Sequence, residues 1–207
     1  MYDPWGLEGA TVAITGASTG IGAALTDAFL DSGAIVLGIS RTPDKHPTTS
    51  PNYRTYAADL SVRSETEALI DTLKADHERI DVLINNAGHA LRAPSVNYPM
   101  DDWDRLIELN LTAPFLLSRG LAPPMLHRGA GKVIFTASLW SFLGGRSVPA
   151  YTVTKSGIAG MIRALSNEWA PQGVQVNGIA PGYIDTDLTR PAINDPEIGP
   201  AFLARIP

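Results

Sequence analysis

The sequence predicts an α/β protein in which a doubly wound parallel sheet carries helices on both faces. Short, fully apolar segments alternate with helix-periodic segments along the 207 residues. Strands that are apolar throughout indicate a sheet buried on both faces, and strands that alternate with helices indicate parallel pairing. No internal repeat, low-complexity tract or linker breaks the alternation, so we expect one domain over residues 1–207.

The same pattern places the expected elements in order. Strands are expected at residues 11–15, 34–39, 53–57, 82–84, 132–137 and 174–180, where short β-type runs stand between turn signals. Helices are expected at residues 20–32, 64–77, 102–127 and 149–169, where apolar residues recur with helical spacing. Residues 42–51 are crowded with Pro, Thr and Ser, which is typical of a loop.

Composition and charge exclude several classes of function. The chain has 16 Lys and Arg against 21 Asp and Glu, and this net charge of −5 argues against nucleic acid or an anionic membrane as the main partner. It has no cysteine, so disulfides, thiolate catalysis and zinc–thiolate sites are excluded. No stretch approaches the ~20 apolar residues of a membrane span, and the first ten residues do not resemble a secretion signal, so we expect a cytoplasmic protein. We expect no metal site, because the histidines are scattered: His46, His77, His89 and His127.

A glycine-rich turn leads from the first expected strand into the first expected helix. Residues 15–22 read TGASTGIG, with glycines at Gly16, Gly20 and Gly22. Glycines suit a turn where the backbone bends tightly or approaches a ligand, and the amides of the helix that follows can bind a pyrophosphate. The alternative is a turn that only packs a helix against a sheet.

Polar residues and glycines follow the later expected strands, at the same edge of the sheet as the glycine-rich turn. Residues 85–88 read NNAG after the fourth strand, and Ser138 follows the fifth. Tyr151 and Lys155 are four residues apart on an expected helix, so their side chains share one face. Pro181-Gly182 follows the sixth strand. In open α/β sheets ligands bind at this carboxyl edge.

This combination resembles the short-chain dehydrogenase/reductase family over nearly the whole chain, which implies a Rossmann-type, three-layer α/β/α fold. The resemblance implies that Ser138, Tyr151 and Lys155 are catalytic, with Asn110 in the segment ELNLTAPF as the fourth member. Tyr151 would exchange the proton of an alcohol while a hydride passes to or from a nicotinamide cofactor, and Ser138 would bind the substrate oxygen. Lys155 would bind the cofactor ribose and, with the oxidised nicotinamide, lower the pKa of Tyr151 from its usual value near 10. Asn110 would hold a water that links Lys155 to solvent.

The resemblance also implies the cofactor contacts. The residues are Gly16, Ser18, Thr19, Gly20, Ile21, Gly22, Ser40, Arg41, Asp59, Leu60, Asn86, Ala87, Gly88, Tyr151, Lys155, Pro181, Gly182, Ile184 and Thr186. Asp59 and Leu60 would lie at the adenine. NAD-preferring relatives place an acid where Ser40 stands, whereas here Arg41 follows and could pair with a 2′-phosphate. NADP(H) is therefore favoured over NAD(H), although Arg41 could instead be a solvated loop residue and Thr19 lacks the basic side chain of some NADP-preferring relatives.

Several short strings resemble the members of this family that oxidise sugar acids, namely gluconate and 2-keto-3-deoxygluconate dehydrogenases. They include SFLGG at residues 141–145 and PGY at residues 181–183. Substrate contacts are expected from Ser138, Trp140, Tyr151 and Arg146. Arg146 or Arg92 could meet a carboxylate, and the alternative is that each is a surface cation. Two alternatives remain open: a reductase of a bulkier apolar ketone or a 3-oxoacyl thioester, and a non-catalytic dinucleotide-binding scaffold.

One departure concerns the C-terminal strand. Family members continue past the ARIP at residues 204–207 with a helix and a seventh strand, and this sequence stops there, so the C-terminal strand is expected to be missing. Relatives form dimers and tetramers. We expect a homodimer through the helices at residues 102–127 and 149–169, because the second carries more apolar residues than one buried face needs, and a weakened tetramer contact.

Overall fold

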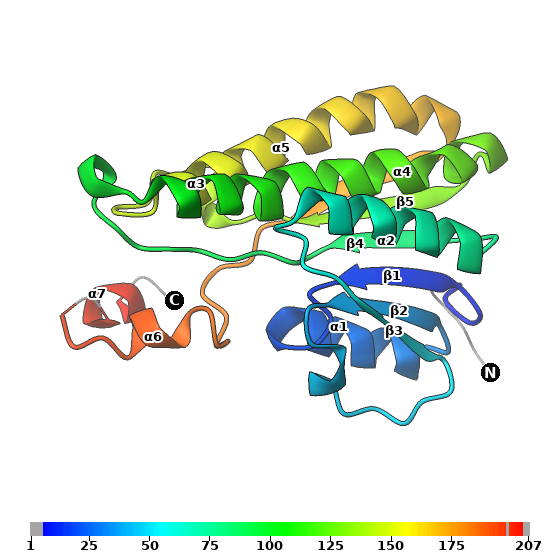
Figure 1. The fold of residues 1–207 in the computed structure, drawn as a ribbon, viewed down its shortest axis with the longest axis horizontal. Coiled ribbons are helices and arrows are strands. Elements are labelled where there is room, and N and C mark those ends of the chain that lie inside the picture. The colour runs from blue at the N-terminus through cyan, green and yellow to red at the C-terminus, as the bar shows by residue number, and fades with distance from the viewer. Residues whose placement is uncertain (1–5, 198, 205–207) are drawn as a thin grey trace.

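The computed structural model describes residues 6–197 and 199–204 and contains one six-stranded, fully parallel sheet (Figure 1). The strand order is β3-β2-β1-β4-β5-β6. The strands are β1 (Thr11–Thr15), β2 (Ile35–Ser40), β3 (Tyr53–Ala57), β4 (Val82–Asn85), β5 (Gly131–Thr136) and β6 (Val174–Ile179). The predicted fold class is confirmed.

Most helices cover one face of this sheet. Figure 1 shows α2 (Arg63–Asp76), α4 (Ala113–Arg128) and α5 (Pro149–Trp169) on one side and α1 (Gly20–Asp31) on the other. Both faces are therefore covered as predicted, but among the described residues the second face carries α1 alone. The outward side of β6 stays exposed at Gln175, Asn177 and Ile179.

Two cores follow the alternation of side chains along the strands. Leu37, Leu83 and Phe135 point into the larger core beneath α2, α4 and α5, and all three are fully buried. Val12 and Val36 point the other way, into a smaller core completed by α1. Successive residues of a strand face opposite sides of a sheet, so strands buried on both faces must be apolar throughout.

The helix expected at residues 102–127 begins earlier and contains a π-helical segment. It runs from α3 (Met100–Ile107) through a π-helix at Glu108–Thr112 into α4. A π-helical turn adds a residue and rotates the side chains that follow, and such turns are frequent at functional sites. Here it carries Asn110, which is buried.

Most of the extra apolar residues of α5, from which an interface was predicted, lie in the core. Ile158, Leu165 and Trp169 are buried, and Met161 and Ile162 pack against the same core. Of the six apolar residues from which an interface was expected, Val153 alone is largely exposed, at 46%. The sequence pattern overestimated the exposed apolar surface of α5, because this helix packs against α3 and the π-helix as well as against the sheet.

Shorter elements complete the described chain. Single 3-10 turns lie at Pro43–Lys45, Ser95–Asn97, Leu139–Ser141 and Ala170–Gln172, and two short helices, α6 (Arg190–Ile193) and α7 (Gly199–Leu203), come last. Figure 1 shows α6 and α7 on the side of the sheet where the strands end. In the part of the chain that is described, no helix is long and apolar enough to cross a membrane.

Candidate active site

The carboxyl ends of the central strands are joined by hydrogen bonds around Asn86. The Thr15 hydroxyl oxygen accepts from the backbone amides of Asn86 and Ala87, both at 2.9 Å. The Asn86 side-chain amide donates to the Thr15 carbonyl oxygen at 3.1 Å, and its oxygen accepts from the Thr136 hydroxyl at 3.2 Å. These bonds connect β1, β4 and β5 at the point where the strand order reverses, which is where ligands bind in open α/β sheets.

The glycine-rich turn after β1 fits closely against this network. A Cβ on Gly22 would lie 2.0 Å from the Gly16 carbonyl oxygen and 2.7 Å from the Asn86 side-chain nitrogen. Gly16 has a φ of +67°, which favours glycine, and its own Cβ would lie 3.0 Å from Ala87 Cα. The turn and the segment after β4 can therefore approach one another only as glycine backbone.

Three cavities meet along this edge. The first, of about 360 Å³, lies between the ends of β1, β2 and β3 and the helix α3. The second, of about 210 Å³, holds Ser138, Tyr151 and Lys155, and shares Gly16, Thr19, Ala87 and Gly88 with the first. The third, of about 440 Å³, shares Ser138 and Tyr151 with the second and extends toward α6. Because neighbouring cavities share lining residues, the three form a continuous path. Tyr151 lies where the second cavity meets the third.

The middle cavity holds Ser138, Tyr151 and Lys155, three of the four residues expected to be catalytic, whereas Asn110 does not line it. Ser138 follows β5, and its backbone amide donates to the Ser141 hydroxyl at 3.2 Å. The Ser141 hydroxyl donates in turn to the Lys155 carbonyl oxygen at 2.7 Å, which connects the strand end to α5. Lys155 is buried, and its Nζ donates to the Thr136 carbonyl oxygen at 2.5 Å. Sequence reasoning missed Ser141; its only signal was its place three residues after Ser138, where a serine can complete a capping box.

Burial shifts the pKa values of Tyr151 and Lys155 in this cavity. It raises the pKa of Tyr151 above its ordinary 10.0, while a hydrogen bond with Ser138 acts in the opposite direction. It lowers the pKa of Lys155 to about 8. Lys155 Nζ lies 5.6 Å from the centroid of the Tyr151 ring, and Lys155 is not among the groups that shift the pKa of Tyr151. The expectation that Lys155 and an oxidised nicotinamide together lower this pKa concerns the protein with its cofactor bound and stays a prediction.

Asn110 holds the segment that follows β4. Its side-chain oxygen accepts from the His89 amide at 2.9 Å, and its nitrogen donates to the His89 carbonyl oxygen at 2.8 Å. A Cβ on Gly88 would lie 3.2 Å from the Asn110 side-chain oxygen and 3.7 Å from Lys155 Nζ. The π-helix thus aligns residues 88–89 next to Lys155, a contact that the sequence did not predict.

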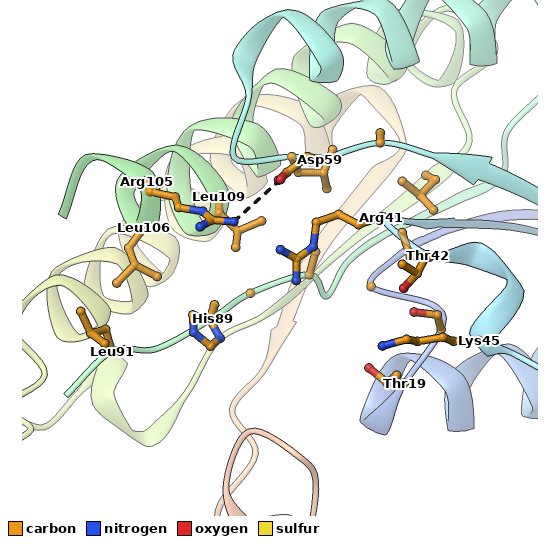
Figure 2. Close-up of a pocket in the computed structure, with 18 of the residues that line it drawn as sticks. Thr19, Arg41, Thr42, Lys45, Asp59, His89, Leu91, Arg105, Leu106 and Leu109 are labelled. Atoms are coloured by element: carbon orange, nitrogen blue, oxygen red, sulfur yellow. Dashed lines mark ion pairs between the residues drawn. The ribbon is translucent and has the colours of Figure 1, made fainter. Parts of the chain in front are cut away.

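The first cavity carries a cluster of charged side chains (Figure 2). Arg41 and Lys45 enter from the segment after β2, and Arg105 enters from α3, with its Nη2 3.8 Å from an Asp59 carboxylate oxygen. Burial opposes ionisation of Asp59, but two hydrogen bonds from Ser61, together with Arg41 and Arg105, hold its pKa below the ordinary value. Burial, Arg41 and Arg105 lower the pKa of His89 at the far wall, against Asp102, which raises it.

The third cavity has mixed chemistry. Trp140, Val148, Leu188 and Ile193 supply apolar surface, and polar groups come from His89, Arg92, Tyr183, Asp187, Thr189 and Asp195. Arg146, expected to contact substrate, does not line this cavity. Its carbonyl oxygen accepts from Arg92 Nη1 at 3.3 Å, so Arg146 supports the side chain of Arg92, which does line the cavity.

The structure brings together almost all of the expected cofactor contacts. Every one except Gly22 lines the first or second cavity. Gly22 packs against Gly16 and Asn86 instead. Sequence reasoning missed the residues that enter from the loop after β2 and from α3, because neither segment carries a motif: Thr42, Lys45, Asp102, Arg105 and Leu106. It also missed Leu109 in the π-helix.

Comparisons with known proteins agree with this geometry. The family model for short chain dehydrogenases matches residues 10–197. The 2-dehydro-3-deoxy-D-gluconate 5-dehydrogenase of Pseudoalteromonas atlantica is 42% identical, and the alignment covers 100% of this chain and 85% of that protein. A structure from Beutenbergia cavernae, assigned as an NAD(P)-dependent gluconate 5-dehydrogenase and holding NADP at low occupancy, has a TM-score of 0.92 at 38% identity over 99% of this chain and 84% of its own.

A third relative was solved with ligands. It is the gluconate 5-dehydrogenase of Burkholderia cenocepacia in complex with NADP and tartrate, with a TM-score of 0.86 at 32% identity over 95% of this chain and 80% of its own. The family match spans most of the chain and includes every residue that lines the three cavities. The chain therefore belongs to the short-chain dehydrogenase family and is an NAD(P)-dependent oxidoreductase that acts on CH–OH groups.

Proposed function

We propose that this protein is an NADP(H)-preferring dehydrogenase of a sugar acid, with Tyr151 as its acid/base group and Ser138, Lys155 and Asn110 around it. The observation that carries the proposal is the continuous path of cavities, in which Ser138 and Tyr151 line both the cavity after the glycine-rich turn and the cavity beside α6. A residue that transfers a proton to a substrate beside a dinucleotide must border both binding sites. We further propose that residues 1–207 form one dinucleotide-binding domain that includes the catalytic residues.

The third cavity supports a substrate that is rich in oxygen and carries an anion. Arg92 is a cation in its lining, positioned by the Arg146 carbonyl oxygen, and an arginine fork suits a carboxylate. Asp187 and Thr189 add groups that can bind hydroxyls. The relatives named above act on gluconate or 2-dehydro-3-deoxy-D-gluconate, which have this chemistry. A bulky apolar ketone would match fewer of the charged and polar side chains of this lining.

The cavities fit a nicotinamide dinucleotide. Gly16 and Gly88 line both the first and the second cavity. Because neither residue has a side chain, neither obstructs a pyrophosphate at the boundary between the two cavities. The Ser40 hydroxyl oxygen is buried without a hydrogen-bond partner among the described residues, at the edge where a ribose would bind. Ser18 and Thr19 precede the N-terminus of α1, whose first amides point toward this turn. Tyr151 and Lys155 would hold the nicotinamide end, and Asp59 and Leu60 the adenine end.

The chain's own residues would handle the proton. In the oxidative direction the Tyr151 phenolate accepts the hydroxyl proton of the substrate, and Ser138 donates a hydrogen bond to the same oxygen. A bound nicotinamide dinucleotide accepts the hydride and, in its oxidised form, supplies the positive charge that lowers the pKa of Tyr151. The Lys155 amine lies in the same cavity, and its pKa of about 8 lets it exchange a proton near neutral pH. In the reductive direction Tyr151 is the acid.

The preference for NADP(H) rests on the end of β2. Ser40 places a neutral hydroxyl where a carboxylate would repel a 2′-phosphate, and Arg41 extends into the first cavity (Figure 2). The structures from Beutenbergia cavernae and Burkholderia cenocepacia both hold NADP. Arg41 makes no ion pair with a carboxylate among the described residues.

We also propose a cytoplasmic homodimer. Phe115 on α4 and Val153 on α5 are 41% and 46% exposed on the helical layer, and apolar side chains exposed on neighbouring helices are typical of an interface. A two-fold axis across this layer would bury both side chains twice.

Substituting Tyr151→Phe should lower kcat by about 10²–10⁴-fold with gluconate or 2-dehydro-3-deoxy-D-gluconate, because the ring stays and only the proton-transferring hydroxyl is removed. Dinucleotide affinity should change little. Tyr56→Phe is the control, because that hydroxyl bonds to Asp76 and His77, outside all three cavities. Turnover of the Tyr151 variant within a few-fold of the parent would exclude the assigned role, and activity only on apolar ketones would exclude the sugar acid.

Substituting Arg41→Ala should raise the Kd of NADPH about tenfold and leave that of NADH nearly unchanged, because only the former carries a 2′-phosphate. Arg54→Ala, an exposed position on the edge strand β3, is the matched control. Equal effects on both cofactors, or a parent protein that binds NADH more tightly, would contradict the proposed preference.

Light scattering should give twice the mass of the chain at micromolar concentration. Val153→Asp should shift the protein toward the monomer, because a desolvated carboxylate would face its two-fold copy. A parent that is monomeric, or a Val153 variant that dimerises as the parent does, would exclude this interface.

A further inference from the structure

The turn at Pro43–Lys45, directly after Arg41, carries a cation that the family's motifs do not assign. Lys45 lines the first cavity together with Arg41, Thr42 and Thr19. Figure 2 shows the Lys45 amine directed toward the cavity, beside Thr19 and Thr42 and on the same side as Arg41. Two cations on one wall repel each other unless an anion lies between them.

The backbone beneath Lys45 is held in place. Its amide donates to the Thr42 carbonyl oxygen, and the His46 amide donates to the Pro43 carbonyl oxygen, both at 3.2 Å. His46 is buried, with its Nε2 3.2 Å from an Asp27 carboxylate oxygen and its ring edge-on to Tyr53 at 5.3 Å between centroids. These contacts place the turn against α1 and β3, so the Lys45 side chain extends toward the cavity from a packed segment.

Neither of these two cations forms an ion pair with a carboxylate among the described residues. Within residues 6–197 and 199–204, neither Arg41 nor Lys45 lies within 4.0 Å of a carboxylate oxygen. The one acid that shares this end of the cavity, Asp59, accepts from the Ser61 amide and hydroxyl and faces Arg105. A ribose 2′-hydroxyl offers no charge to this wall, whereas a phosphate monoester carries up to two negative charges and three acceptor oxygens.

We propose that Lys45 is a second cation for the 2′-phosphate of NADP(H), a specificity residue that acts beside the Arg41 guanidinium. The inference rests on the proposed preference for NADP(H) and adds the residue that contributes to it. Arg41 would bind two phosphate oxygens through its planar fork, and Lys45 would act as a mobile point charge on the remaining oxygen, with Thr19 and Thr42 as hydroxyl donors nearby.

The test uses nucleotides that separate the phosphate from the rest of the cofactor. Binding of 2′,5′-ADP and of 5′-AMP would be measured by calorimetry on the parent, Lys45→Ala, Arg41→Ala and the double variant. Lys45→Ala should weaken 2′,5′-ADP binding roughly three- to tenfold and leave 5′-AMP unchanged, and its affinity should fall less steeply with added salt. Lys45→Arg should restore most of the lost affinity, and Lys74→Ala, an exposed lysine near the end of α2, is the control.

The outcomes distinguish this inference from the preference on which it rests. If the parent binds 2′,5′-ADP no more tightly than 5′-AMP, the preference for NADP(H) fails and the inference with it. If Arg41→Ala loses 2′,5′-ADP affinity and Lys45→Ala does not, the preference stands and the role of Lys45 is excluded. Equal loss of both nucleotides in Lys45→Ala would show that the turn only supports the cavity, and would also exclude it.

Discussion

The side-chain amide of Asn86 joins three parallel strands at the edge of the sheet where the three cavities lie. It donates to the carbonyl oxygen of Thr15 and accepts from the Thr136 hydroxyl, while the Thr15 hydroxyl receives the amides of residues 86 and 87. Parallel strands pair through their backbones but leave their last groups unsatisfied, and a buried polar group without a partner costs about 1–3 kcal/mol. The glycine-rich turn, the segment after β4 and the end of β5 are thereby held in one arrangement.

The catalytic geometry follows from that arrangement. Thr136, which donates to Asn86, also accepts from Lys155 Nζ through its carbonyl oxygen, so the same strand end positions the amine beneath Tyr151. Gly22 cannot carry a side chain because the turn closes on Asn86, and Gly88 lies between the Asn110 side chain and Lys155. Burial lowers the pKa of Lys155 to about 8 and raises that of Tyr151.

The sequence was sufficient for the fold class, because apolar periodicity and glycine positions record the burial of strands and the turns between them. Strand bounds differ from those observed by a residue or so, and α5 agrees at both ends. Features that depend on three-dimensional packing were not predictable. The π-helix at Asn110 has no local signal, and the apolar residues of α5 gave no sign that most of them pack into the core rather than on a second subunit. Arg146 and Arg92 carry the same chemistry, and only the fold shows which of them lines the cavity.

Dinucleotide binding by an Asn86→Asp variant tests most directly whether this one amide organises the site. The change keeps the shape of the side chain but turns a donor into a carboxylate that faces the carbonyl oxygens of Thr15 and Gly16. Asn177→Asp, an exposed position on β6, makes the same chemical change away from the site. We expect calorimetry to show NADPH affinity reduced at least about tenfold in the Asn86 variant and unchanged in the Asn177 variant, since the repulsion and the lost bond cost about 1–3 kcal/mol. An Asn86 variant that binds NADPH as tightly as the parent would contradict the account.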